Sequence, residues 1–308
     1  MNKKLEILVL EKSEGYELLD SGRGEKLERW GGVITRRPDP QALWKKNQSD
    51  SEWKKADAVF TRDSESAKWK FKHEESEKKW QIPFEGLKFW IKPTAFKHTG
   101  LFPEQAENWK WMKEIISDAK GGAEMEIEVL NLFGYTGGAS LSCATAGAKV
   151  THVDSSKSAI TWANENAEAS GLKEKSIRWI LEDARSFVAK EIKRGRKYDG
   201  ILLDPPAFGH GANDEVWKIE DDFLPFIKDC MELLSEKPLF FLINGYSAGY
   251  SAIAYENNLL PLLGKFGGKI EIGELTVKET GNTEEVGNLE KNSEARLLPC
   301  GIFARWKK

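Results

Sequence analysis

The sequence predicts an α/β protein in which a mostly parallel sheet, covered by helices, follows a small β-rich domain. From Glu126 onward, candidate strands and helices alternate, which is the pattern of a parallel sheet with helices on its faces. Before Lys92, short stretches of alternating hydrophobicity are separated by turn residues, as in a small β domain. We therefore expect a β-rich domain over residues 1–92 and an α/β domain over residues 93–308.

The composition is that of a soluble globular protein. With 308 residues, 40% of them hydrophobic, the chain can bury a substantial core. No apolar run approaches the roughly 20 residues of a transmembrane helix, and the first residues do not form a signal peptide, so we expect a cytoplasmic protein without a membrane partner. The formal charge of −3 argues against a strongly cationic surface for nucleic acid but leaves room for a local basic face. The cysteines are widely spaced, so we expect neither a disulfide nor a metal, and we interpret all three as core residues: Cys143, Cys230 and Cys300.

The N-terminal part is rich in tryptophan, lysine and glutamate. Its alternating stretches include Leu5–Leu10 and Phe89–Ile91, which we expect to be strands of the small β domain. A core role for its tryptophans is favoured over a base-stacking platform, because aliphatic residues are scarce here: Trp30, Trp44, Trp53, Trp69, Trp80 and Trp90. The charge run Lys68–Lys79 is expected to be a solvated face, with RNA contact as the alternative.

The α/β part begins with a helix that starts near Pro103, since proline suits a first helical turn, and ends by Gly121. Five strands are predicted at Ile127–Phe133, Lys149–Asp154, Ser176–Glu182, Tyr198–Asp204 and Leu239–Asn244. Five helices are predicted at Gly138–Ala146, Lys157–Ser170, Ala184–Arg194, Phe223–Leu234 and Ala252–Lys265. Two long strands, Lys269–Glu279 and Arg296–Trp306, and the polar loop Thr280–Glu294 between them predict a terminal antiparallel hairpin.

A glycine-rich turn follows the first strand of the predicted sheet. Gly134, Gly137 and Gly138 stand where the chain turns sharply before a helix of small residues. A ligand could approach bare backbone here, and the N–H groups of the helix start could meet an anion. A turn that is glycine-rich for geometry alone is the alternative.

Acidic residues end the next two strands. Asp154 lies 20 positions after Gly134, the spacing at which a carboxylate can accept hydrogen bonds from ribose hydroxyls. Asp183 could accept from an adenine amino group. For each residue, capping of the following helix is the alternative. Because ligands bind beyond the carboxyl ends of parallel strands, the set favours a cofactor that contains a nucleoside.

The fourth strand ends in Asp204-Pro205-Pro206-Ala207-Phe208. Two consecutive prolines stiffen the loop and remove two N–H donors, which leaves carbonyls to accept from an amino group. Phe208 can stack on a flat ring, and the Asp204 carboxylate can accept a further hydrogen bond. We expect this loop to hold a planar nitrogen base against the cofactor.

These motifs resemble class I S-adenosylmethionine-dependent methyltransferases, and more closely the large-subunit ribosomal RNA methyltransferases with a small β domain before the catalytic domain. The resemblance rests on Asn131–Gly138, Val153–Lys157, Glu182–Ala184 and Leu203–Gly209, and Lys97–Gln105 resembles the segment that closes over the cofactor in that group. It implies a Rossmann-like seven-stranded sheet with an antiparallel last strand, in agreement with the terminal hairpin.

The resemblance also implies the cofactor, S-adenosylmethionine, and the residues that hold it. The turn would seat the methionine part through Phe133, Gly134, Tyr135, Thr136, Gly137 and Gly138. Asp154 and Ser155 would hold the ribose, and Asp183 and Ala184 the adenine. The catalytic set facing the acceptor base would be Asp204, Pro205, Pro206 and Phe208, with Asp204 also at the cofactor.

Two departures from the family bear on the mechanism. Members that methylate carbon 5 of cytosine need a cysteine nucleophile, and Leu242–Ser247 contains none. Direct displacement from a sulfonium requires mainly alignment, so we expect a nitrogen acceptor on a purine of ribosomal RNA. Asn244 and Tyr246 either line the pocket or make ordinary loop hydrogen bonds. The RNA-binding module of many relatives has no clear counterpart.

Three alternatives stay open at this stage. The fold could methylate a protein side chain or a small amine, or the chain could be a non-catalytic cofactor-binding module, which the intact Asp204–Phe208 loop argues against. A nicotinamide-dependent oxidoreductase is disfavoured by the glycine spacing. The sequence does not indicate an oligomeric state.

Overall fold

The computed structural model describes residues 4–62, 67–73, 78–121, 125–210, 216–246, 249–281 and 295–308. They divide into two compact units. The first unit consists of Met1–Leu8, Gln105–Leu275 and Gly301–Lys308, and the second of Val9–Glu104 and Thr276–Cys300. The division expected at residues 92 and 93 stays a prediction.

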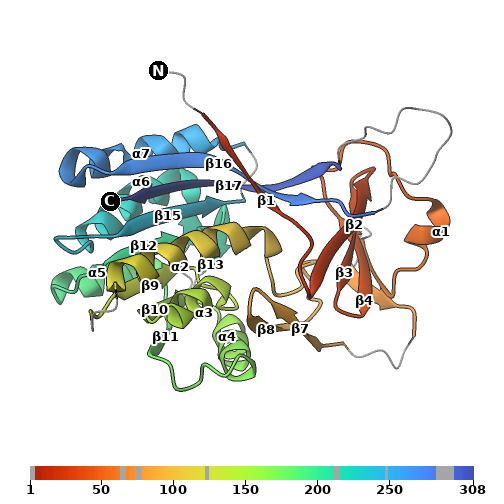
Figure 1. Cartoon of the computed structure of the whole chain (residues 1–308), viewed down its shortest axis with the longest axis horizontal. Coiled ribbons are helices and arrows are strands. Elements are labelled where there is room, and N and C mark those ends of the chain that lie inside the picture. Colours follow the sequence, from red (N-terminus) through yellow and green to blue (C-terminus); the bar gives the residue numbers. More distant parts are fainter. Residues whose placement is uncertain are drawn as a thin grey trace. The chain divides into compact units, whose positions relative to one another are not determined.

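The largest sheet confirms the predicted α/β fold class (Figure 1). Its strands in spatial order are β1 (Glu6–Leu10), β16 (Lys269–Lys278), β17 (Leu297–Lys307), β15 (Phe240–Gly245), β12 (Gly200–Leu203), β9 (Glu128–Leu132), β10 (Lys149–Asp154) and β11 (Ile177–Leu181). From β11 to β15 every neighbouring pair is parallel, whereas β17 runs antiparallel to β15, as expected for the last strand.

The expected count of seven strands is wrong by one. Glu6–Leu10, which we assigned to the small β domain, lies beside β16 at the edge of this sheet. The physical reason is that an alternating strand can pair with any open sheet edge, so its pattern does not identify its partner.

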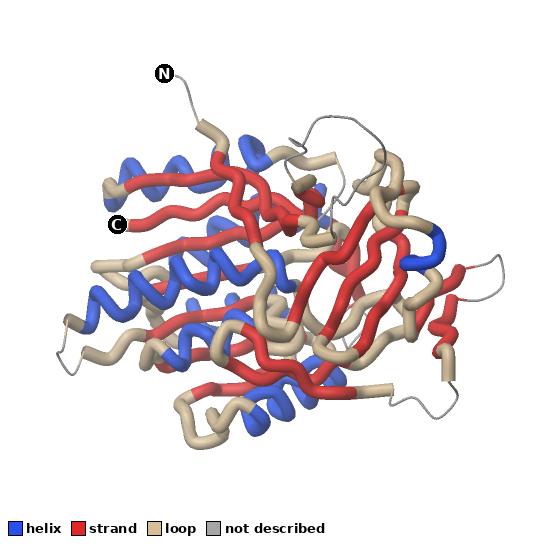
Figure 2. The backbone as a smooth tube through the Cα atoms, turned by 45° about the vertical axis from the view of Figure 1, so that its right-hand side comes forward, coloured by secondary structure: helices blue, strands red, loops and turns tan. Residues whose placement is uncertain are grey.

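Six helices connect or follow these strands close to their predicted bounds: α2 (Ala106–Lys120), α3 (Gly138–Thr145), α4 (Lys157–Ala169), α5 (Ala184–Lys193), α6 (Ile219–Glu232) and α7 (Ala252–Phe266), with the 3-10 turn η1 (Pro103–Gln105) before α2. Helices lie on both faces of the parallel strands (Figure 2). α2 packs on α3, whereas α5, α6 and α7 pack in series. None of the helices in the described residues is long and apolar enough to cross a membrane.

Helix α6 begins four residues before its predicted start at Phe223. Its first turn carries Glu220, Asp221 and Asp222, which favour a helix start through the dipole. Asp222 also accepts the Lys218 backbone N–H at 2.8 Å. The core on this side of the sheet joins Leu132 and Leu203 to apolar residues of α5, α6 and α7.

The second unit is built from antiparallel strands with one parallel pair. A five-stranded sheet contains β2 (Tyr16–Gly22), β3 (Glu25–Trp30), β4 (Val33–Pro38), β5 (Ala58–Arg62) and β6 (Ala67–Phe71), and a hairpin contains β7 (Trp80–Phe84) and β8 (Leu87–Ile91). The short helix α1 (Asp50–Trp53) precedes β5. Of the six tryptophans expected in the core, Trp30, Trp53 and Trp80 are buried, whereas Trp44, Trp69 and Trp90 are partly buried. Residues 74–77 of the charge run and 282–294 of the polar loop lie outside the described residues.

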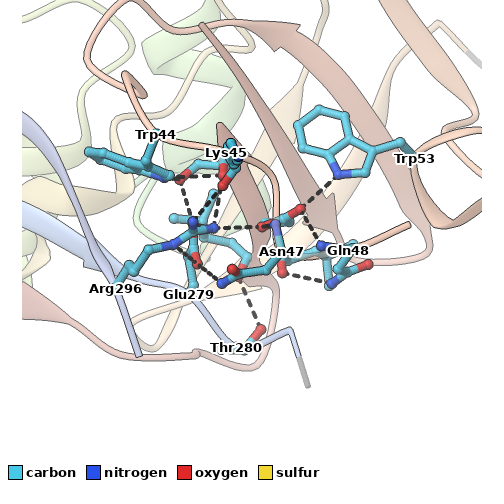
Figure 3. A network of polar contacts seen from close by, with 12 residues as sticks. Trp44, Lys45, Asn47, Gln48, Trp53, Glu279, Thr280 and Arg296 are labelled. Carbon is cyan, nitrogen blue, oxygen red and sulfur yellow. Dashed lines mark hydrogen bonds and ion pairs between the residues drawn. The ribbon is translucent and has the colours of Figure 1, made fainter. Parts of the chain in front are cut away.

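A polar cluster joins the two chain segments of the second unit (Figure 3). Arg296 donates to Asp20 Oδ1 at 2.9 Å and to Glu279 Oε2 at 2.9 Å, and both carboxylates are buried. Asp20 also accepts the indole N–H of Trp53 at 2.7 Å, and Glu279 accepts from the Ser21 hydroxyl at 2.5 Å. The cation therefore compensates two carboxylates that burial would otherwise destabilise.

Candidate active site

The glycine-rich turn after β9 has an unusual backbone. Phe133 and Tyr135 adopt positive φ values of 58° and 49°, and Gly137 has φ 89°. Positive φ is costly for aromatic residues, so surrounding contacts must hold the turn. The Gly134 N–H donates to the Val153 carbonyl at 3.0 Å, and Asn166 on α4 donates to the Thr136 carbonyl at 2.9 Å.

Packing behind the turn explains two of its glycines. A Cβ on Gly134 would lie 2.3 Å from the His152 ring, and one on Gly138 would lie 2.4 Å from the Trp109 ring. Glycine is therefore required here by the protein's own side chains, which the sequence pattern did not reveal. Helix α3 starts after Gly137 without a side-chain cap, so the N–H groups of its first turn suit an anionic group.

Asp154 lies at the end of β10, next to this turn. Its Oδ2 accepts the Tyr135 N–H at 2.9 Å, and its Oδ1 accepts the Ser156 N–H at 2.8 Å. Burial raises the pKa of Asp154 above its usual value, and the two N–H groups oppose that shift. The cap of α4 is Ser156, so capping by Asp154 itself is not its role. Each carboxylate oxygen keeps a second lone pair for a ligand hydroxyl.

Asp183 follows β11, whose Leu181 is the register partner of Asp154. The alternative role of Asp183, helix capping, is observed: its Oδ1 accepts the Ser186 N–H at 3.0 Å at the start of α5. Arg185 lies 3.5 Å from Asp183 and 2.8 Å from Asp222. Capping uses Oδ1, and Ala184 is buried behind the cap.

Asp204 follows β12, which lies between β9 and β15. Its Oδ2 accepts the side-chain amide N–H of Gln105 at 2.8 Å, and the same amide nitrogen lies 3.1 Å from the Tyr246 hydroxyl. Tyr246 thus belongs to the group around Asp204. Asn244 does not, because it is buried and accepts from Asn108 at 2.9 Å.

The loop after Asp204 is fixed by Trp217, a residue that we did not predict. Its indole N–H donates to the Pro206 carbonyl at 2.6 Å, and its buried ring packs against Phe133 at 5.3 Å between centroids. Trp217 therefore joins the acceptor loop to the glycine turn. The Pro206 carbonyl is occupied, contrary to our expectation that it could accept from a substrate, whereas no donor lies on the Pro205 carbonyl among the described residues.

Phe208 is 53% exposed and begins the short strand β13 (Phe208–His210), which pairs with β14 (Val216–Lys218). About half of the Phe208 surface is therefore accessible to solvent next to the acceptor loop. No residue pattern marked Trp217 or Gln105 as partners of this loop, although Gln105 ends the segment that carried part of the resemblance.

A comparison with known protein families shows which family the chain belongs to. Residues 52–251 match the family model described as S-adenosylmethionine-dependent methyltransferase. The chain belongs to this family. The expected family, enzyme class and cofactor are thereby confirmed.

Similar proteins agree with this methyltransferase assignment. The solved structure of an S-adenosylmethionine-dependent methyltransferase from Agrobacterium tumefaciens is 40% identical, has a TM-score of 0.88, and covers 98% of this chain and 93% of that chain. A putative methyltransferase complexed with SAH shares the fold, with 18% identity, a TM-score of 0.65, and coverage of 96% of this chain and 76% of that chain.

Two curated relatives match the methyltransferase over about half of its length. The ribosomal RNA large subunit methyltransferase K/L of Shewanella frigidimarina is 32% identical over 152 residues, which are 49% of this chain and 20% of the relative. The ribosomal RNA large subunit methyltransferase K of Neisseria meningitidis serogroup B is 27% identical over 161 residues, which are 52% of this chain and 43% of the relative. The match thus spans less than half of either relative.

The residues present fit S-adenosylmethionine. The uncapped start of α3 suits its carboxylate, and Asp154 offers acceptors for its ribose hydroxyls. The cofactor supplies a methyl group on a sulfonium, a leaving group that needs no further activation. Among the described residues, no group of three or more histidine, cysteine, aspartate or glutamate side chains is placed to hold a metal.

Proposed function

We propose that this methyltransferase transfers a methyl group to a nitrogen of a base in ribosomal RNA, by direct displacement without a cysteine nucleophile. The observation that carries the proposal is the acceptor loop. Gln105 orients the Asp204 carboxylate, Trp217 fixes the loop beside the cofactor turn, and Pro205 offers a carbonyl. Two oxygen acceptors at a rigid loop suit the N–H groups of a base.

The cysteines support displacement without a covalent intermediate. Cys143 is buried on α3 and Cys230 on α6, and burial raises the pKa of both thiols, that of Cys143 to about 12. Cys300, in the second unit, is only partly exposed rather than fully buried in the core as we expected, and desolvation raises the pKa of its thiol as well. A thiol with a raised pKa is a poor nucleophile at neutral pH.

The roles of the cofactor residues are part of the proposal. Phe133, Gly134, Tyr135, Thr136, Gly137 and Gly138 receive the methionine end, Asp154 and Ser155 the ribose, and Asp183 and Ala184 the adenine. Asp183 retains Oδ2 for this purpose, because the cap of α5 uses Oδ1. Asp204, Pro205, Pro206 and Phe208 face the acceptor, and Asp204 borders the cofactor as well. The role of Pro206 is to stiffen the loop, since its carbonyl is bound by Trp217.

Ribosomal RNA enters the proposal through the names of the two curated relatives and the exposed ring of Phe208, on which a base can stack. With this substrate we propose a cytoplasmic location. A protein side chain or a small amine could also meet the Asp204 carboxylate, and these acceptors are the competing outcomes of the test.

The test follows a labelled methyl group from S-adenosylmethionine into separated ribosomal RNA, protein and small-molecule fractions of a cell extract. We expect the label in ribosomal RNA, on a base nitrogen after nucleoside digestion. Label confined to protein or small molecules, or on a base carbon, would overturn the proposal.

Two matched variants test the role of Asp204 in methyl transfer. Asp204→Asn removes the charge at the acceptor loop and should abolish most of the transfer while S-adenosylhomocysteine still binds. Asp199→Asn changes the same residue type before the opposite end of β12, where Asp199 accepts the Glu128 N–H at 3.0 Å, and should leave transfer near the wild-type rate. Equal rates in the two variants would contradict the role of Asp204.

A further inference from the structure

A chain of buried polar side chains lies beneath the glycine turn in the first unit. Asn131 on β9 donates through its amide to the Ser140 hydroxyl at 2.8 Å, and this hydroxyl lies 2.9 Å from Nδ1 of His152 on β10. All three side chains are buried. They have no role in the chemistry derived above, and their burial costs free energy that the hydrogen bonds among them offset.

His152 lies directly behind the turn. The ring is in contact with Gly134, where a Cβ would approach three ring atoms to 2.3, 2.5 and 2.9 Å. Trp179 on β11 packs against the imidazole, with ring centroids 4.8 Å apart. The histidine therefore fills the space between the sheet and the backbone that receives the cofactor.

The hydrogen-bond chain sets the form of the ring. Burial lowers the pKa of His152 to about 3, against an opposing effect of the Tyr135 backbone, so the ring is neutral at pH 7. The Ser140 hydroxyl accepts the amide N–H of Asn131 and can donate its own O–H to Nδ1, and in that tautomer the ring proton is on Nε2. Nε2 is buried and has no hydrogen-bond partner among the described residues.

We propose that His152 is a positioning residue for the cofactor: its neutral ring, oriented by Ser140 and Asn131, supports Gly134 and Tyr135 from the core side and holds the turn in its receptive conformation. The turn needs such support because Phe133 and Tyr135 have positive φ values. Tyr135 in turn donates its N–H to Asp154 at 2.9 Å. A shift of the His152 ring would thus change the position of the turn and, through the Tyr135 N–H, that of Asp154, the proposed ribose acceptor.

The experiment compares S-adenosylhomocysteine affinity, measured by calorimetry, with thermal unfolding for four variants. His152→Phe keeps an aromatic ring but removes both nitrogens, and it should weaken affinity about tenfold, the equivalent of one hydrogen bond. Ser140→Ala removes the group that orients the ring and should weaken affinity in the same direction. His152→Gln keeps an acceptor, the side-chain amide oxygen, for the Ser140 hydroxyl and should restore affinity to within about threefold of wild type.

Val150→Ala is the control, because Val150 is buried on the same strand and pairs with Val129 and Ile177 away from the turn. It should lower the melting temperature without changing affinity. The double variant Ser140→Ala/His152→Phe tests whether the two residues act together. It should bind S-adenosylhomocysteine no more weakly than His152→Phe alone, since both residues belong to one hydrogen-bond chain.

Wild-type affinity in Ser140→Ala and His152→Phe would overturn the proposal. So would an affinity loss in Val150→Ala equal to that of His152→Phe, because the effect would then follow stability alone. If His152→Phe does not fold, Ser140→Ala and His152→Gln still decide the question. The measurement uses no RNA, so its outcome is independent of the proposed acceptor.

Discussion

The contact between Gln105 and Asp204 predicts the effect of a single isosteric change. Gln105→Glu replaces an amide that donates to Asp204 Oδ2 at 2.8 Å with a carboxylate of nearly the same shape. Two negative charges about 4 Å apart repel by about 4 kcal/mol at an effective dielectric constant of about 20. The charge-assisted hydrogen bond, worth about 1.5 to 3 kcal/mol, is lost as well.

We expect Gln105→Glu to lower the free energy of unfolding by about 2 to 4 kcal/mol at pH 8, less than the sum of these two terms, because Asp204 is only partly buried and water screens part of the repulsion. The loss should shrink towards pH 5, where one proton can be shared by the two carboxyl groups. Urea unfolding at both pH values measures this difference. Methyl transfer should fall, since the orientation of Asp204 changes, while S-adenosylhomocysteine affinity is retained.

Gln81→Glu is the matched control. It makes the same substitution on β7, where the side chain of residue 81 is exposed to solvent and the added charge is hydrated. It should unfold like wild type at both pH values. Wild-type stability of Gln105→Glu at pH 8, or a loss that grows towards pH 5, would refute the assignment of this contact.

Three further predictions rest on other contacts. Trp217→Phe removes the N–H that holds the Pro206 carbonyl but keeps a ring against Phe133, so transfer should slow while cofactor affinity is unchanged, as steady-state kinetics and calorimetry will show. Arg296→Met leaves buried carboxylates without their cation and should cost about 3 kcal/mol of unfolding free energy in urea, whereas an unchanged midpoint would contradict the role of the cluster. Burial alone would raise the pKa of Glu28, but Arg37 and Lys26 lower it from 4.5 to about 2. Its contribution, about 3 kcal/mol, is therefore present above pH 4.5 and lost as the pH falls towards 2, and Glu28→Gln should flatten acid unfolding in that range.

Most of the parallel sheet could be predicted because each of its strands is a short apolar run followed by a helix with its own start signal. Lys149–Asp154 was predicted to the residue. The edge strand Glu6–Leu10 was assigned to the wrong sheet, because hydrophobic alternation describes a strand's two faces and not its neighbour. The start of α6 was missed because its first turn is acidic and its apolar stripe begins later.

The strand ends could be predicted as a site because parallel strands bring their carboxyl ends to one edge. Leu132, Leu203 and Ile243 are register partners across three strands, so the loops that follow them are neighbours. What surrounds these loops could not be predicted. Gln105 is 99 positions from Asp204, and Trp217 reaches Pro206 from β14, which pairs with β13, so no local pattern encodes either contact.

The Asp20–Arg296 ion pair limits when the second unit can finish folding during synthesis. These residues are 276 positions apart, although Asp20 meets the Trp53 indole much earlier in synthesis. The strands β2 to β4 therefore leave the ribosome with a carboxylate whose cation has not yet been made. Long-range contacts of this kind slow folding, and domains usually fold in the order of their synthesis. In this protein the earlier segment of the second unit completes its polar interior only after the later segment, which carries Arg296, has been synthesised.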